Sequence, residues 1–214
     1  MNYTGIDLGT TNSAICSYDG ESIHLYKSPE QHDVTPSAIF IDRRGNKYVG
    51  SRAYNNAARH PESAATGFKR LMGTSTPVKL PAVNMTMTPE DCSAEILRVM
   101  VGYLPAEIRN DDLTGTVITV PAAFNQMQKD STMSAAVAAG IGRVALMQEP
   151  VAAVMSVMRQ RKHDGVFCVY DLGGGTFDVT VVSYTPTHFR VLATDGDVML
   201  GGIDWTNRIV EHVA

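Results

Sequence analysis

Two stretches of the chain share one pattern of apolar and polar positions. In each, an apolar run ends in Asp-Leu-Gly, a short turn rich in Gly and Thr follows, and a second apolar run begins at once; the stretches are 3–16 and 166–182. This pattern predicts a strand, a tight turn and a second strand. Asp7 and Asp171 hold equivalent places in the two copies, which indicates an internal duplication.

The rest of the chain alternates between strand and helix patterns, so we expect an α/β fold. Thr88, followed by Pro89 and by Asp91 at the third helical position, predicts a helix start. The buried face of that helix is expected at Ile96, Leu97, Met100, Val101 and Leu104. Further strands are expected at 14–18, 22–26, 38–42, 47–49, 116–120, 144–147 and 187–195. Further helices are expected at 51–60, 62–72, 126–139, 151–161 and from Ile203 onward, and 77–88 is expected to be a loop.

The glycine turns indicate where ligand chemistry would lie. Gly173, Gly174 and Gly175 allow the backbone to bend and to approach a ligand closely, and a row of amides in such a turn forms an anion site. Asp171 adds a carboxylate and Thr176 a hydroxyl, and a carboxylate beside a phosphate is commonly bridged by Mg²⁺. Two such hairpins facing each other would grip a nucleotide from both sides.

Other phosphate-binding motifs fit this sequence poorly. A P-loop needs Gly-Lys-Ser/Thr, which is absent, and a Rossmann turn needs a helix after its glycines, where strands are expected here. One glycine-rich hairpin alone would be an ordinary tight turn. Two copies, each with Asp-Leu-Gly and a following threonine, favour a nucleotide site.

The composition argues against several classes of protein. The chain has 214 residues, of which 44% are hydrophobic and 19% charged, with a formal net charge of −4, as is typical of a globular protein. The sequence has no block of Lys and Arg that would indicate nucleic-acid binding, no apolar run of membrane-spanning length and no histidine ligand pair. Cys16, Cys92 and Cys168 lie far apart and are expected to be buried free thiols of a cytoplasmic protein.

Six segments spread over the chain carry a family resemblance. They are Gly5–Ser13, Phe68–Gly73, Val120–Asn125, Glu149–Ala153, Asp171–Asp178 and Leu200–Asp204. In sequence and in order they resemble motifs of the seventy-kilodalton heat-shock chaperones (DnaK-type), which belong to the actin-like ATPase superfamily. The two phosphate motifs alone would indicate the superfamily, whereas the segments with Lys69 and Glu149 indicate the chaperone branch.

The resemblance implies an actin-like ATPase (ribonuclease H-like) fold with duplicated mixed-sheet lobes, and ATP hydrolysis that switches a peptide-binding domain beyond this sequence. It implies ATP or ADP and Mg²⁺ as ligands, with K⁺ as a further candidate ion. The implied partners are unfolded or partly folded polypeptide clients, J-domain co-chaperones and nucleotide-exchange co-chaperones; neither nucleic acid nor a membrane is expected.

The resemblance also assigns roles to individual residues. Asp7, Glu149 and Asp171 would hold Mg²⁺ through its waters. The catalytic residues would be Lys69, Glu149, Asp171 and Thr176, with Asp178 lining the approach of water. The nucleotide-binding residues would be Gly9, Thr10, Thr11, Asn12, Gly173, Gly174, Gly175, Thr176, Gly201 and Gly202.

The expected organisation is a first lobe at 1–161 with an inserted subdomain at 37–115, a hinge at 162–165 and the start of a second lobe at 166–214. The last helix shows no stop signal before Ala214, so the second lobe is expected to be incomplete. ATP would then bind this sequence more weakly than two complete lobes.

The sequence departs from the family pattern in three motifs. Gln148 and Val151 stand where the family has Asn and Thr, Ala123 replaces an aromatic residue, and Lys129 replaces an arginine that works with Pro121 as a relay of the nucleotide state. Lysine lacks the bidentate fork of arginine, so this relay is expected to differ. Two alternatives from other classes stay open: a small-molecule kinase, which would need an aspartate base facing a substrate pocket, and an actin-like filament protein.

Overall fold

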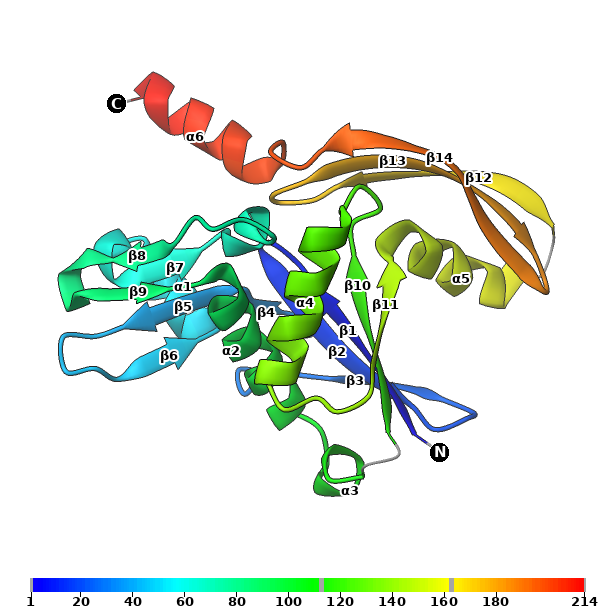
Figure 1. The fold of residues 1–214 in the computed structure, drawn as a ribbon, viewed down its shortest axis with the longest axis horizontal. Helices are drawn as coiled ribbons and strands as arrows, with labels where there is room; N and C mark the ends of the chain where they lie inside the picture. Colours follow the sequence, from blue (N-terminus) through cyan, green and yellow to red (C-terminus); the bar gives the residue numbers. More distant parts are fainter. Residues whose placement is uncertain (1, 112–113, 162–163, 214) are drawn as a thin grey trace. The chain divides into compact units, whose positions relative to one another are not determined.

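The computed structural model describes residues 2–111, 114–161 and 164–213 (Figure 1). These residues form two compact units, one made of Met1–Ile118 and Gln126–Leu146, the other of Thr119–Asn125 and Met147–Ala214. The units group 147–161 with the second hairpin, whereas the sequence assigned this segment to the first lobe; the lobe boundaries stay a prediction. Of the predicted hinge, 162–163 lie outside the described residues, and Gly165 already belongs to a strand.

A mixed six-stranded sheet carries the first predicted hairpin. Its strands are β1 (Tyr3–Leu8), β2 (Asn12–Tyr18), β3 (Ile23–Tyr26), β4 (Thr35–Pro36), β10 (Gly115–Val120) and β11 (Val144–Gln148). The order is β11–β10–β1–β2–β3, with β4 beside β2. β1 runs antiparallel to β2 and parallel to β10. Because side chains alternate along a strand, Ile6 and Leu8 are buried while Asp7 between them is exposed.

Two smaller sheets lie between β4 and β10 along the chain. β6 (Lys47–Val49), β5 (Ala38–Ile41) and β7 (Ala64–Thr66) form a three-stranded sheet in that order, and β8 (Val78–Leu80) pairs with β9 (Met85–Met87). The single-turn helices between them are η1 (Pro61–Ser63), η2 (Phe68–Leu71) and η3 (Pro81–Val83). The helices of this unit are α1 (Ser51–Ala57), α2 (Pro89–Gly102), α3 (Ala106–Arg109) and α4 (Gln126–Ala138).

Two secondary-structure predictions in this region are wrong. The helix predicted at 62–72 is η1, β7 and η2 instead, because Ala64–Thr66 pairs with β5 and Gly67 then takes a left-handed conformation with φ 65°. The loop predicted at 77–88 contains the hairpin of β8 and β9. The helix predicted at 51–60 ends three residues earlier, at Ala57. The other predicted helices and strands agree with the structure within about two residues.

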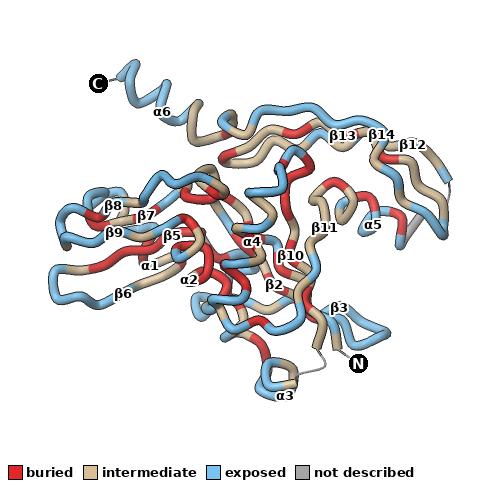
Figure 2. The backbone as a smooth tube through the Cα atoms, in the orientation of Figure 1, coloured by how far each residue is buried: buried red, intermediate tan, exposed pale blue. Residues whose placement is uncertain are grey.

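Helix α2 forms the centre of the first unit's core. Thr88 caps it as predicted: its Oγ1 accepts a hydrogen bond from the Asp91 amide at 3.0 Å, and the Asp91 carboxylate accepts one from the Thr88 amide at 3.0 Å. Its predicted stripe is buried at Ile96, Leu97 and Met100 and partly buried at Val101; Leu104 is also buried but lies beyond the end of the helix at Gly102. This side of α2 is among the most deeply buried parts of the unit (Figure 2).

The second unit is an antiparallel sheet with a helix packed against it. β12 (Gly165–Leu172), β13 (Phe177–Thr185) and β14 (His188–Asp197) run in sequence order, and the helices are α5 (Glu149–Arg161) and α6 (Gly202–Val213). Val154 and Met158 of α5 pack on Val182 of β13, together with the partly buried Phe167 and Val169 of β12. This core explains why β13 is buried at its centre.

The buried-thiol prediction holds for one cysteine of three. Cys92 is buried, Cys16 is half-buried and Cys168 is exposed. Cys168 lies between Phe167 and Val169, which both pack toward α5, so the strand period directs Cys168 to the opposite face.

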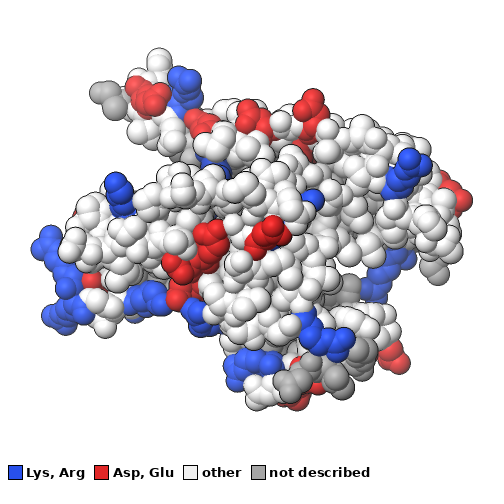
Figure 3. Space-filling view, viewed as in Figure 1, with Lys and Arg blue, Asp and Glu red and all other residues white. Residues whose placement is uncertain are grey.

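Helix length and surface charge bear on the predicted absence of membrane and nucleic-acid partners. Within the part of the chain that the structure describes, no helix is long and apolar enough to cross a bilayer. Acidic and basic side chains are interspersed on the face shown in Figure 3. The absence of nucleic-acid and membrane partners stays a prediction.

Candidate functional site

The first glycine turn consists of the four residues 9–12 between the paired Leu8 and Ser13, and its last residue, Asn12, already begins β2. Gly9 fits only as glycine, because a Cβ there would collide with the backbone carbonyl of Asn12. Such a collision cannot be relieved by a side-chain rotation, so the turn depends on this glycine.

A residue that the sequence analysis did not assign fixes the shape of this turn. Ser37 Oγ donates to the Gly9 carbonyl at 2.7 Å, and the Ser37 amide donates to the Thr11 carbonyl at 2.8 Å. Ser13 Oγ lies 2.9 Å from Ser37 Oγ and donates to it, since the Ser37 proton goes to Gly9. Ser37 directly follows β4, and no local signal in the sequence indicated its long-range contact with the turn.

Two hydroxyl side chains of the turn are turned inward. Thr10 is 8% exposed. The Thr11 Oγ1 atom is buried and has no hydrogen-bond partner among the described residues. A buried hydroxyl normally has a partner, so an unsatisfied one in a glycine turn fits a ligand that supplies acceptor oxygens, such as a phosphate.

The second glycine turn has the same length and strand register as the first. It joins β12 to β13 through four residues, 173–176, between the paired Leu172 and Phe177, and the Gly173 amide donates to the Thr176 carbonyl at 3.0 Å. Asp171 lies directly opposite Asp178 across the two strands. The predicted duplication is therefore present at the level of strand register, because each turn has four residues and follows a strand that ends in Asp-Leu.

The start of α6 is packed onto the second turn. A Cβ on Gly201 would lie 2.6 Å from the backbone of Gly174. The Gly202 amide donates to the Gly173 carbonyl at 3.0 Å, and the Ile203 amide donates to the Gly174 carbonyl at 2.9 Å. The backbone carbonyl groups of Gly173 and Gly174 are therefore hydrogen-bonded to the start of α6. Gly201 and Gly202 thus support the turn through their backbone, which the sequence analysis had not foreseen.

Asp204 holds this junction together and was also not predicted. Its carboxylate accepts a hydrogen bond from the Gly201 amide at 2.8 Å, and its own amide donates to the Gly201 carbonyl at 3.0 Å. An acid in the first turn of a helix that accepts from a preceding amide is a capping arrangement. The segment Leu200–Asp204 carried a signal for this cap, since Asp204 stands three residues after Gly201.

The four acidic residues assigned to the site differ in exposure. In the first unit, Asp7 is exposed at the end of β1. In the second, Glu149 is the first residue of α5, directly after β11, and is half-buried, as is Asp171. Asp178 is 3% exposed. No three His, Cys, Asp or Glu side chains of the described residues lie together in a way that would hold a metal ion by themselves.

Lys69 lies in η2 and is 4% exposed, which is rare for a lysine. Phe68 and Met72 on either side are 2% and 0% exposed. The sequence predicted a helical setting for Lys69; the segment is a single 3₁₀ turn between two glycines with positive φ, Gly67 at 65° and Gly73 at 75°.

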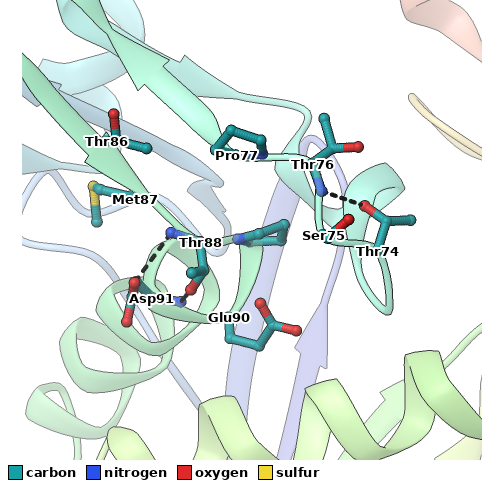
Figure 4. Close-up of a pocket in the computed structure, with 10 residues that line it drawn as sticks. Thr74, Ser75, Thr76, Pro77, Thr86, Met87, Thr88, Glu90 and Asp91 are labelled. Carbon is teal, nitrogen blue, oxygen red and sulfur yellow. Dashed lines mark hydrogen bonds between the residues drawn. The ribbon is translucent and has the colours of Figure 1, made fainter.

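A cavity of about 150 Å³ lies beyond this turn (Figure 4). It is lined by 74–77, by the end of β9 and by the start of α2, and its hydroxyl groups include the capping Thr88. None of the predicted site residues lines it. We assign it no role in the site.

Comparison with known proteins places the chain in a family. The family model described as Hsp70 protein matches residues 3–214. The "Stromal 70 kDa heat shock-related protein, chloroplastic" of Pisum sativum is 35% identical over 98% of this chain and 33% of its own length. "Chaperone protein DnaK" of Mycoplasmoides gallisepticum is 38% identical over 98% of this chain and 35% of its own length. "Chaperone protein HscA homolog" of Bordetella pertussis is 35% identical over 97% of this chain and 36% of its own length.

The chain therefore belongs to the Hsp70 protein family. It spans about a third of the length of the curated relatives it matches. The predicted resemblance and the predicted actin-like ATPase fold are confirmed. The family is one of ATP-binding chaperones, and the alternatives of a small-molecule kinase or an actin-like filament protein are not favoured.

Proposed function

We propose that the chain binds Mg-ATP, that the protein hydrolyses it, and that turnover switches a peptide-binding chaperone domain. The observation that carries the proposal is the pair of four-residue glycine turns in a member of the Hsp70 family. Each turn follows a strand that ends in Asp-Leu, and the first holds a buried hydroxyl, at Thr11, that has no hydrogen-bond partner among the residues the structure describes. These features fit a polyphosphate held by backbone amides and hydroxyls.

The proposed roles follow the chemistry of each side chain. Thr10, Thr11 and the turn at Gly173, Gly174 and Gly175 would hold the phosphates. Lys69 would hold the terminal phosphate and orient the attacking water, with Thr176 and Asp178 along the water's approach. Phosphoryl transfer depends mainly on such positioning and on electrostatic stabilisation.

Magnesium fits the donor set of the predicted metal residues. Asp7, Glu149 and Asp171 offer carboxylate oxygens, which Mg²⁺ prefers, and Mg²⁺ usually keeps several waters when one or two carboxylates and a phosphate hold it. A site of this kind needs no cluster of direct ligands. Bound Mg²⁺ would supply neutralisation of the phosphate charge. We include K⁺ as a further candidate ion on the family resemblance alone.

The partners and the location are also proposals. Polypeptide clients, J-domain proteins and nucleotide-exchange factors are proposed from the family, and the cytoplasm is proposed from the sequence. Lys129 lies in the first part of α4 and is half-buried, and Pro121 is buried. We propose that this pair relays the nucleotide state less strongly than a proline–arginine pair would.

Calorimetric titration with ATP, with and without Mg²⁺, tests the proposal. We expect binding that requires Mg²⁺ and that Gly9→Ala abolishes, because the added Cβ displaces the Asn12 carbonyl. Gly142→Ala is the matched control, since its Cβ would meet nothing within 4 Å. If the parent does not bind ATP, the function is wrong; if Gly9→Ala binds as the parent does, the first turn is not the phosphate site.

A further inference from the structure

We propose that the first turn of α4 positions Lys69, and that Gly73 is the positioning residue through which it does so. This inference rests on the proposed role of Lys69 in ATP hydrolysis and adds a structural element to it. The two segments are far apart in sequence and belong to the same compact unit.

The first step is the contact between Gly73 and α4. A Cβ built on Gly73 would lie 2.8 Å from the Gln128 backbone nitrogen, 2.9 Å from Gln128 Cγ and 3.0 Å from the Met127 carbonyl carbon. Two of these three atoms belong to the helix backbone and cannot rotate away. The backbone of Gly73 therefore lies against the start of α4 with no room for a methyl group.

The second step is the short, rigid path from Gly73 back to Lys69. Met72 is fully buried, its sulfur accepts a hydrogen bond from Ser93 Oγ at 3.4 Å, and its amide donates to the Lys69 carbonyl at 3.2 Å. On the other side of Gly73, Thr74 donates to the Leu71 carbonyl from its amide at 3.1 Å and from Oγ1 at 2.8 Å. A displacement at Gly73 would thus be passed to Lys69 rather than absorbed.

The third step is that α4 is itself anchored elsewhere. Arg98 of α2 donates to the carbonyl of Ala138, the last residue of α4, at 2.8 Å, and also pairs with Glu95 at 2.6 Å. Lys47 of β6 pairs with the same Glu95 at 2.6 Å. A movement of α4 relative to these anchors would change the backbone contact between Gly73 and the first turn of α4. Because Lys129 follows Gln128 directly, this contact would connect the proposed relay residue to Lys69.

The chain offers a matched pair of glycines for the test. Gly73 and Gly140 both have positive φ, 75° and 85°, so alanine strains the backbone similarly at either position. Gly140 follows the opposite end of α4, and its Cβ would meet nothing within 4 Å. Both alanine variants carry the cost of positive φ, but only Gly73→Ala also collides with α4. The difference between the two variants therefore measures the effect of the α4 contact. Gly73→Asn provides a second variant that tolerates positive φ while still adding a Cβ.

The experiment uses two readouts on the folded variants. The first is the acetylation rate of the Lys69 amine by an acylating reagent without nucleotide, followed by mass spectrometry; the second is the kcat and KM of ATP hydrolysis. The Cβ of Gly73→Ala would lie 2.8 Å from the Gln128 backbone nitrogen, whereas ordinary van der Waals contact begins near 3.4 Å. The backbone at position 73 must therefore move away from α4 by about 0.6 Å. We expect faster acetylation of Lys69 and a fall of kcat of about tenfold or more, with little change in KM. Gly140→Ala should lower the melting temperature without either effect.

The outcomes separate this inference from the proposed function. If acetylation of Lys69 is as slow in both Gly73 variants as in Gly140→Ala, the inference is wrong. If acetylation rises while the parent shows no ATP hydrolysis, the positioning is supported and the proposed function fails. If acetylation rises but kcat matches that of Gly140→Ala, α4 sets the position of Lys69 without affecting turnover, and the catalytic part of the inference is overturned.

Discussion

Replacing Thr11 with valine should stabilise the protein and weaken ATP binding at the same time. Valine has nearly the shape of threonine, and it removes a hydroxyl that is buried without a partner among the described residues. An unsatisfied buried hydroxyl costs about 1–3 kcal/mol, so Thr11→Val should gain about 1 kcal/mol when no nucleotide is bound. A hydrogen bond to a charged group contributes about 1.5–3 kcal/mol, so affinity for Mg-ATP should fall about 10- to 100-fold.

Thr4→Val is the matched control for this prediction. Thr4 Oγ1 is hydrogen-bonded to Thr116 Oγ1 at 2.7 Å in a buried setting. Its replacement would leave the Thr116 hydroxyl buried without this partner, which costs about 1–3 kcal/mol. For a chain of this size, 1 kcal/mol corresponds to about 2–4 °C in melting temperature. Thr4→Val should therefore melt lower and bind ATP as the parent does.

Thermal unfolding without nucleotide and calorimetric titration with Mg-ATP measure both effects. Thr11→Val should melt above the parent and bind ATP more weakly. If it melts as low as Thr4→Val, the hydroxyl contributes to the nucleotide-free fold and the reasoning fails. If it melts higher but binds ATP with parental affinity, Thr11 does not contact the phosphates.

Two further predictions concern regulation and thiol chemistry. In the protein with its proposed peptide-binding domain, Lys129→Arg should increase the stimulation of ATP hydrolysis by peptide, because arginine restores the bidentate fork; unchanged stimulation would count against the proposed relay. Burial, followed by neighbouring carboxylates, raises the pKa of the Cys92 thiol to about 12, so iodoacetamide at pH 8 should modify Cys168 much faster than Cys92. Alkylation of Cys92 as fast as that of Cys168 would contradict the raised pKa. Since the folded-state pKa of Cys92 is raised above the ordinary value of 9.0, the stability that Cys92 contributes is complete below pH 9 and is lost as the pH rises toward 12.

Local patterns were sufficient to predict the two hairpins. An apolar run, a glycine turn and a second apolar run specify a hairpin by themselves, and Asp7 and Asp171 are each the second-last residue of their strand, in equivalent registers. The start of α2 was predictable for the same reason, because the capping box uses residues three positions apart.

The errors concern features that depend on distant contacts. Ala64–Thr66 is a strand because it pairs with β5, more than twenty residues earlier, and its own three residues carry too little pattern to indicate this. Ser37 supports the first turn through bonds to Gly9 and Thr11. The exposure of Cys168 depends on which face of β12 packs against α5.

The rate of ATP hydrolysis, measured with and without Mg²⁺ for the protein and for Lys69→Ala and Asp171→Asn, tests the central claim most directly. Each variant removes one electrostatic partner of the developing phosphate charge, so each should lower the rate about 10²- to 10³-fold, with circular dichroism like that of the parent. Hydrolysis by Lys69→Ala at the parental rate, or turnover that does not depend on Mg²⁺, would contradict the account.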